Sequence, residues 1–199
     1  MSVERQLWVL AGGNGVGKST FYKSSLLPKR GVRFLNADLI ARSINPENTE
    51  QVSYQAANLV GRLRDELLHK GITFCFETVF SHPSKIDFIA KAKAFGYQIV
   101  LVYIHLNALD LNEARVSQRV SEGGHNVPPE KIRNRLPRTM MHVATALQLV
   151  DEAWLLDNSS HDEPFKQVAL IRKGKRIKTI DSLPVWAKQI LKHIPENRF

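Results

Sequence analysis

The sequence predicts an α/β fold in which helices flank a mostly parallel sheet. Strand-like and helix-like segments alternate along the 199 residues, which is typical of parallel strands joined by helical crossovers. Residues 98–106, QIVLVYIHL, are apolar on both faces, as a central parallel strand is. Residues 11–20, AGGNGVGKST, place a glycine-rich turn between an apolar stretch and a helical pattern.

The first half of the chain is expected to alternate short strands with longer helices. Strands are predicted over residues 7–11, 32–36 and 72–79, and helices over 18–27, 50–70 and 83–95. Within 50–70 the apolar residues recur at helical spacing, whereas 72–79 is rich in residues that favour strands. Gly96 follows the third helix at the position where glycine commonly ends one.

The second half is expected to add a helical lid, a last parallel strand, a hairpin and a terminal helix. After the strand at 98–106 we predict a basic helix over 109–122, a break at GGHNVPP, and helical spacing again over 130–150. Pro137 predicts a kink or a new start in that last segment. We predict a parallel strand at 153–156, a hairpin of 168–172 with 176–180, and a helix over 184–194.

The predicted organisation is one domain over residues 1–199, with a lid over roughly 109–140, because no linker or internal repeat interrupts the pattern.

The composition limits which classes of partner and which cellular compartment we expect for the protein. The net charge of +9 favours anionic partners, which include nucleotides, phosphorylated metabolites, nucleic acid and acidic proteins. No apolar run is long enough to span a bilayer, and residues 1–6 lack a signal-peptide pattern, so we expect no membrane contact. Cys75, the single cysteine, lies in a predicted strand, where a buried inert thiol in a reducing cytoplasm is expected.

The glycine-rich turn has the spacing of a Walker A motif, with Gly12, four residues, and then Gly17-Lys18-Ser19. Glycines allow successive backbone N–H groups to point at a phosphate. Lys18 is expected to reach the β- and γ-phosphates of ATP, and the Ser19 hydroxyl to ligate Mg²⁺. The predicted nucleotide-binding residues are Gly13, Asn14, Gly15, Val16, Gly17, Lys18, Ser19 and Thr20. The sequence therefore predicts a P-loop NTPase; the alternative is a glycine-rich turn before an ordinary helix.

Polar residues follow three of the predicted strands, at the edge where open α/β sheets bind ligands. Asp38 follows the second strand, Glu77 and Thr78 end the third, and Asn158 follows the last parallel strand, where a loop around the adenine base is expected. We predict that Asp38, Glu77 and Thr78 contact the substrate. The alternatives are that Asp38 caps a helix, that Glu77 is a surface carboxylate, and that Asn158 belongs to an ordinary turn.

A basic stretch after the central strand supplies the cations that phosphoryl transfer requires. Arg115 and Arg119 lie four residues apart and so on one helix face, and Arg135 lies beyond the glycines that precede His125. Two arginine-bearing arms around a glycine-rich tip are typical of a closing lid. A solvated pair of basic helices is the alternative.

Together, AGGNGVGKST, LNADLIA, FETVFS and RVSEGGHNVPPEKIRNR make residues 6–160 resemble the zeta-toxin-like P-loop kinases, in particular their small stand-alone bacterial branch. Zeta toxins phosphorylate the 3′-hydroxyl of the sugar in UDP-N-acetylglucosamine and are held inactive by an antitoxin. The resemblance implies that Asp38 is the catalytic base, with Lys18 and Arg119 also catalytic.

By the same resemblance Glu77 is an acid on the substrate side, and His125 stands at the second lid-arginine position, where Arg135 is the alternative. The arginine and threonine that follow this glutamate in the toxins have no clear match in residues 78–85, which leaves the acceptor open.

The resulting hypothesis is an ATP- and Mg²⁺-dependent kinase that acts on a hydroxyl of a small anionic, nucleotide-like acceptor. The charge and the basic hairpin leave a nucleic-acid end kinase as an alternative, although no aromatic residues alternate with the basic ones to stack on bases. A nucleotide-dependent binding module without a small-molecule acceptor is the third possibility. No Asn-Lys-x-Asp motif and no typical Walker B strand are present, which favours the kinase.

Overall fold

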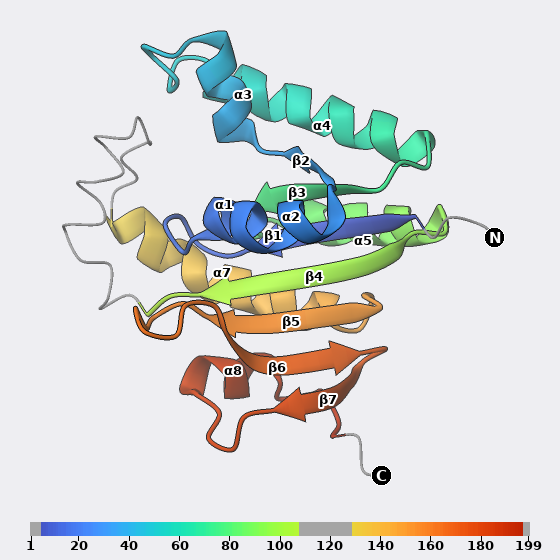
Figure 1. Cartoon of the computed structure of the whole chain (residues 1–199), viewed down its shortest axis with the longest axis vertical. Coiled ribbons are helices and arrows are strands. Elements are labelled where there is room, and N and C mark those ends of the chain that lie inside the picture. Colours follow the sequence, from blue (N-terminus) through green and yellow to red (C-terminus); the bar gives the residue numbers. More distant parts are fainter. Residues whose placement is uncertain (1–4, 108–128, 197–199) are drawn as a thin grey trace.

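A seven-stranded sheet organises the protein, as the computed structural model shows (Figure 1). The structure describes residues 5–107 and 129–196. The strand order is β2-β3-β1-β4-β5-β6-β7. The strands are β1 (Gln6–Ala11), β2 (Arg33–Leu35), β3 (Phe74–Thr78), β4 (Gln98–His105), β5 (Glu152–Asp157), β6 (Lys166–Arg172) and β7 (Lys175–Thr179). The first five pair in parallel, and β6 and β7 extend the sheet in antiparallel pairing.

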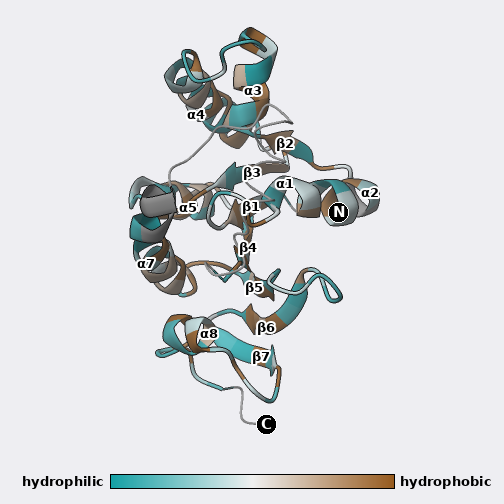
Figure 2. Ribbon diagram, turned by 90° about the vertical axis from the view of Figure 1, so that its left-hand side faces the viewer, coloured by the Kyte–Doolittle hydropathy of each residue, from teal (hydrophilic) through white to brown (hydrophobic). Residues whose placement is uncertain are grey.

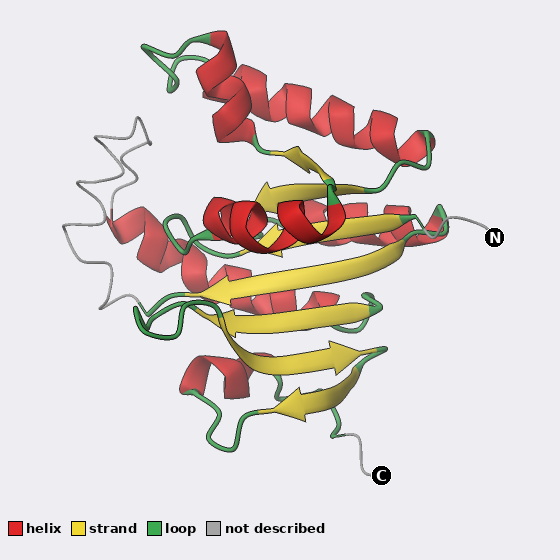
Figure 3. Ribbon diagram, in the orientation of Figure 1, coloured by secondary structure: helices red, strands yellow, loops and turns green. Residues whose placement is uncertain are grey.

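Helices cover both faces of this sheet (Figures 2 and 3). They are α1 (Lys18–Phe21), the π-helical turn η1 (Tyr22–Leu26), α2 (Leu27–Arg30), α3 (Ala37–Ile44), α4 (Ser53–His69), α5 (Ser84–Ala94), α7 (Pro129–Ala146) and α8 (Val185–Ile190). Figure 2 places α5, α7 and α8 on one face, α1 and α2 on the other, and α3 and α4 beyond the β2 edge.

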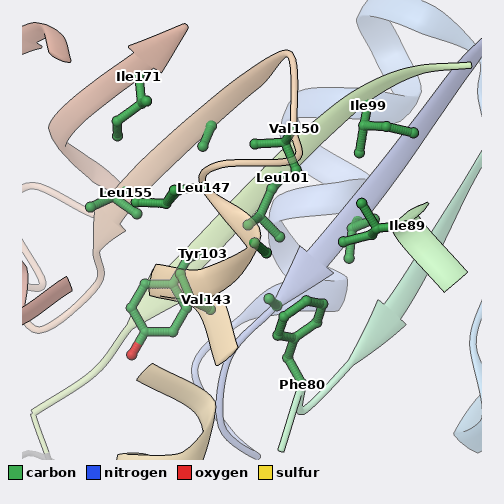
Figure 4. Packing of buried hydrophobic residues seen from close by; sticks show 14 of the residues in the cluster. Phe80, Ile89, Ile99, Leu101, Tyr103, Val143, Leu147, Val150, Leu155 and Ile171 are labelled. Carbon is green, nitrogen blue, oxygen red and sulfur yellow. The ribbon is translucent and has the colours of Figure 1, made fainter. Parts of the chain in front are cut away.

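Each face of the sheet has its own hydrophobic core, because alternate side chains of a strand point to opposite faces. The larger core joins the strands to α4, α5, α7 and α8, and Figure 4 shows Ile99, Leu101 and Tyr103 of β4 within it. In the smaller core, Phe21, Tyr22 and Leu26 pack against Trp8 and Leu10 of β1 and against the side chains of β3 and β4 that point to the opposite face of the sheet. A sheet that is buried on both faces explains the continuous apolar run of β4.

The predicted fold class is confirmed, including the C-terminal hairpin and the helix after it. Of the two outcomes predicted at Pro137, a new start does not occur, because one helix runs from Pro129 to Ala146. Residues 37–44 form α3, and its N-cap is Asn36, so the alternative that Asp38 caps this helix does not hold.

The expectation that the Cys75 thiol is buried is confirmed. Cys75 is fully buried in β3, and burial raises the pKa of its thiol well above the usual value, so the thiol stays protonated and unreactive. In the two described ranges, no helix combines the length and the apolar character that crossing a bilayer requires.

Candidate functional site

The glycine-rich turn lies between β1 and α1, at the carboxyl end of a strand in the middle of the sheet. Gly15 and Gly17 have φ angles of 85° and 94°, which residues other than glycine rarely adopt. A Cβ on Gly12 would lie 2.4 Å from the carbonyl oxygen of Ile104, so only glycine lets the loop pass this close to β4. The backbone therefore has the left-handed glycine conformations on which a phosphate-binding nest depends.

The Lys18 side chain is folded back over this loop and is only 5% exposed. Its Nζ donates hydrogen bonds to the carbonyl oxygens of Gly12 at 3.0 Å and Gly13 at 2.7 Å. The same nitrogen lies 3.5 Å from Oε1 of Glu77 at the end of β3. The ammonium group is thus held above the turn, where a phosphate bound to the loop would meet it.

Glu77 is the centre of a polar cluster that joins three elements. Its Oε2 accepts a hydrogen bond from the Ser19 hydroxyl at 2.7 Å and another from the Asn36 side-chain amide at 2.7 Å. The Glu77 side chain is 13% exposed, so these hydrogen bonds are largely shielded from water. The structure therefore brings Lys18, Ser19 and Glu77 together, as the strand-end argument predicted.

Asn36 belongs to this cluster, although the sequence analysis did not select it. Its side-chain oxygen accepts a hydrogen bond from the backbone N–H of Leu39 at 3.0 Å, so Asn36 is the N-cap of α3. One side chain thereby begins a helix and fixes Glu77. The signal that could have identified Asn36 is the preference for asparagine at a helix start, directly before Ala-Asp-Leu-Ile.

Asp38 lies in the first turn of α3, two residues after this cap. Its side chain is exposed and faces solvent, in contrast to the buried amide of Asn36. Because Asn36 bonds directly to Glu77 and caps α3, the helix start that carries Asp38 lies beside the P-loop cluster.

Asn158, which follows β5, supports the glycine-rich turn through a hydrogen bond. Its amide nitrogen donates to the carbonyl oxygen of Val16 at 3.0 Å, and its side-chain oxygen accepts from the backbone N–H of Phe165 at 3.2 Å. The Phe165 ring packs edge-on against Phe21, with 5.3 Å between the ring centroids. A Cβ on Gly17 would lie 2.8 Å from this amide nitrogen, which is a second reason for glycine there.

The loop that leaves β3 is fixed by α7. The Thr139 hydroxyl donates a hydrogen bond to the carbonyl oxygen of Val79 at 3.0 Å. Nδ1 of His142 lies 3.1 Å from the carbonyl oxygen of Phe80. Phe80 is fully buried at a φ of 64°, an uncommon conformation for a non-glycine residue. Thr78 accepts a hydrogen bond from the Phe80 N–H and so closes the turn.

Arg135 is partly exposed on α7, four residues before Thr139, and so lies on the helix face that meets this loop. The other predicted lid residues, Arg115, Arg119 and His125, lie outside the described residues. Among the residues that are described, no group of three or more His, Cys, Asp and Glu side chains could hold a metal ion.

Comparisons with known proteins identify relatives of this chain. Residues 4–161 match the Zeta toxin family. An uncharacterized protein of Haemophilus influenzae is 31% identical over 140 residues, which cover 67% of this chain and 99% of that protein.

Solved structures give a similar result. One from the PezAT chromosomal toxin–antitoxin system of Streptococcus pneumoniae has a TM-score of 0.64 at 13% identity, covering 100% of this chain and 81% of that one. A structure of AvrRxo1-ORF1:-ORF2 with ATP has a TM-score of 0.67 at 17% identity and covers 100% of this chain and 66% of that one. At such identities the structural likeness shows a shared fold. Because the family match extends over most of the sequence, the chain belongs to the Zeta toxin family.

Proposed function

We propose that the protein is a kinase that uses ATP and Mg²⁺ to phosphorylate a hydroxyl of a small anionic acceptor. The observation that carries this proposal is the convergence of Lys18, Ser19 and Glu77 on the glycine turn after β1. Membership of the Zeta toxin family supports it, as does the ATP in the structure of the AvrRxo1 complex.

The P-loop residues are suited to binding the phosphates. The backbone N–H groups of residues 13–20 and the Lys18 ammonium would surround the β- and γ-phosphates, and Asn158 keeps the loop in shape through Val16. Ser19 and Glu77 place two hard oxygen atoms 2.7 Å apart beside this loop, the donor type that Mg²⁺ prefers. Bound Mg²⁺ would offset negative charge on the phosphates.

Asp38 is proposed as the base. In the transfer, the acceptor hydroxyl oxygen forms a bond to the γ-phosphorus while the bond from that phosphorus to the β–γ bridging oxygen breaks. ADP leaves, and the hydroxyl proton passes to the Asp38 carboxylate and then to water. The position of Asp38 in the first turn of α3, the helix that begins at Asn36, supports this role, because Asn36 is bonded to Glu77 in the P-loop cluster. Arg119 keeps the catalytic role that the sequence predicts, and the predicted binding roles are kept for Thr78, Asn158, Arg115, His125 and Arg135.

Replacing Asp38 by asparagine separates transfer from nucleotide binding. We expect the Asp38→Asn variant to bind ATP within about threefold of wild type and to lose at least about 99% of transfer, because the amide cannot accept the proton. The assay incubates the protein with ATP labelled in the γ-phosphate and a bacterial metabolite extract, and mass spectrometry then identifies the phosphorylated product. Exposed Asp181, after β7, supplies the matched control Asp181→Asn.

Full transferase activity in Asp38→Asn would show that Asp38 is not the base. ATP hydrolysis that no metabolite fraction changes would instead favour a nucleotide-dependent binding module. UDP-N-acetylglucosamine belongs in the acceptor set because the Zeta toxin family includes kinases of that nucleotide sugar. An antitoxin-type protein partner is part of the same proposal.

A further inference from the structure

The guanidinium of Arg64 lies against two aromatic rings on the face of β3 opposite the P-loop cluster, and a second cation, Lys85, is close to it. Arg64 comes from α4, and its guanidinium carbon lies 5.0 Å from the ring centroid of Phe76 and 4.6 Å from that of Phe88. The two rings pack edge to face at 5.6 Å, so together they form a rigid apolar support for the guanidinium. Lys85 comes from the first turn of α5 and is partly buried close enough to repel Arg64.

In the described part of the chain, the side chains of Arg64 and Lys85 form no hydrogen bond and no salt bridge, and Nε of Arg64 is buried without an acceptor. Burial lowers the pKa of both groups, and for Lys85 the neighbouring guanidinium lowers it further. Asp65 partly opposes the effect on Arg64, but the Asp65 carboxylate is bonded to Lys91 at 2.7 Å.

Two partly buried cations that repel each other are unfavourable unless an anion compensates them. An arginine whose guanidinium is held beside two rings loses little further entropy when it binds, and it presents a planar set of donors that suits phosphate or carboxylate. Lys85 adds a second positive charge near that guanidinium. The arrangement has the features of an anion-binding site and is poorly explained as packing alone.

The position of this pair relates it to the P-loop cluster. Thr78 lies on the same face of β3 as Phe76, whereas Glu77 faces Ser19 and Lys18. The pairing of β2 with β3 ends at Leu35–Phe76, so the last two residues of β3 have no partner in β2. The Phe76 ring that contacts Arg64 therefore belongs to the residue directly before Glu77 on the same strand, on the opposite face of the sheet.

We propose that Arg64 and Lys85 bind an anionic group of the phosphoryl acceptor, so that the acceptor carries a phosphate or a carboxylate in addition to the hydroxyl that is phosphorylated. This assignment rests on the proposed kinase activity and names the part of the acceptor that the chain holds. The anion lies on the α4–α5 face of β3, and the acceptor extends past the end of that strand toward Asp38.

Inorganic phosphate tests the anion site without any turnover. The P-loop is first saturated with a non-hydrolysable ATP analogue and Mg²⁺, and the melting temperature is then followed as phosphate replaces chloride at constant ionic strength. We expect phosphate to stabilise wild type, and Arg64→Met and Lys85→Met to lose most of that shift. Methionine retains an apolar chain over the rings, Arg64→Lys retains the charge, and exposed Arg62 on the same helix provides the control Arg62→Met.

A shift that survives in both Arg64→Met and Lys85→Met would overturn the proposal, as would an equal loss in Arg62→Met. A second measurement divides the metabolite extract on an anion exchanger before labelling with ATP. Label confined to retained compounds supports the anionic acceptor, and label in the neutral flow-through overturns it while the kinase stands. If no fraction is labelled, the proposed kinase activity and the proposed acceptor both fail. The effect of phosphate on the melting temperature then decides whether an anion site exists.

Discussion

The side chain of Asn36 makes two separate interactions in the candidate site. It is only 5% exposed, and its amide donates to Glu77 while its oxygen caps α3. The same amide lies 3.4 Å from the Ser19 hydroxyl. A single side chain thus couples the direction of the Glu77 carboxylate to the helix that carries Asp38.

Serine at position 36 would separate these two roles. Serine caps helices about as well as asparagine, so we expect Asn36→Ser to lower the free energy of unfolding by less than about 1 kcal/mol. It has no amide to reach Glu77, and we expect transfer to fall at least about tenfold, since a charge-assisted hydrogen bond is worth roughly 1.5–3 kcal/mol. Urea denaturation and the labelled-ATP assay measure the two effects.

Alanine at the same position removes both interactions and should lower stability and transfer together. The exposed Asn48, which caps no helix, serves as the control Asn48→Ser. Unchanged transfer in Asn36→Ser would mean that Glu77 does not depend on this amide.

At the residue scale, the sequence predicted the part of the site that depends on local spacing. Lys18 and Ser19 follow from the Walker A pattern, because a glycine turn and a helix start are specified by neighbouring residues. The contact between Asn36 and Glu77 joins residues 41 positions apart, and no local pattern specifies it. The pairing of Arg64 with Phe76 and Phe88 was not predictable for the same reason.

Among the elements, α7 holds the loop after β3 in place, a role that its sequence pattern does not predict. Thr139 and His142 contact the carbonyl oxygens of Val79 and Phe80, which positions the loop between β3 and α5. The helical period predicted α7, and of the kink or new start predicted at Pro137 the new start does not occur. A proline within a helix removes one backbone hydrogen bond. The tertiary contacts that follow it at Thr139 and His142 hold the helix in place.

Valine at position 139 tests this attachment. Thr139→Val preserves shape but leaves the Val79 carbonyl without its donor in a buried place, so we expect the free energy of unfolding to fall by about 1–3 kcal/mol. Urea denaturation provides the measurement. The control is Thr145→Val on the same helix, because the Thr145 hydroxyl is exposed and bonds only within α7. Equal losses in both variants would show that helix propensity, and not the loop contact, sets the cost.

Over the whole molecule, the C-terminal segment is joined to the edge of the sheet at which the parallel strands end. Trp186 of α8 stacks on His105 at the end of β4, with 4.5 Å between ring centroids, and donates to Asp157 at the end of β5. The Tyr103 hydroxyl lies 3.1 Å from the His105 ring. The hairpin and α8 were predicted as elements, but their connection to these strand ends depends on tertiary packing.

His105 should make stability depend on pH. Burial lowers its pKa, and the nearby Asp157 carboxylate only partly opposes this. Below the unfolded value of about 6.5, the unfolded chain therefore binds more protons than the native protein, and stability falls as the pH falls. We expect urea denaturation at pH 7.5 and 5.5 to show a smaller loss in His105→Gln than in wild type.

The exposed His161 provides the control His161→Gln, which should retain the pH dependence of wild type. An equal loss on acidification in wild type and His105→Gln would show that other groups determine the acid sensitivity.

The bond between Asn158 and Val16 spans 142 positions of the chain. Proteins are synthesised from the N-terminus, so the Walker A residues leave the ribosome long before the asparagine that supports them. A nascent chain that ends before Asn158 has the full phosphate-binding sequence and lacks its brace. We therefore expect the loop to reach its final conformation late in translation, together with the last parallel strand, because the hydrogen bond to Val16 forms only once Asn158 has been synthesised.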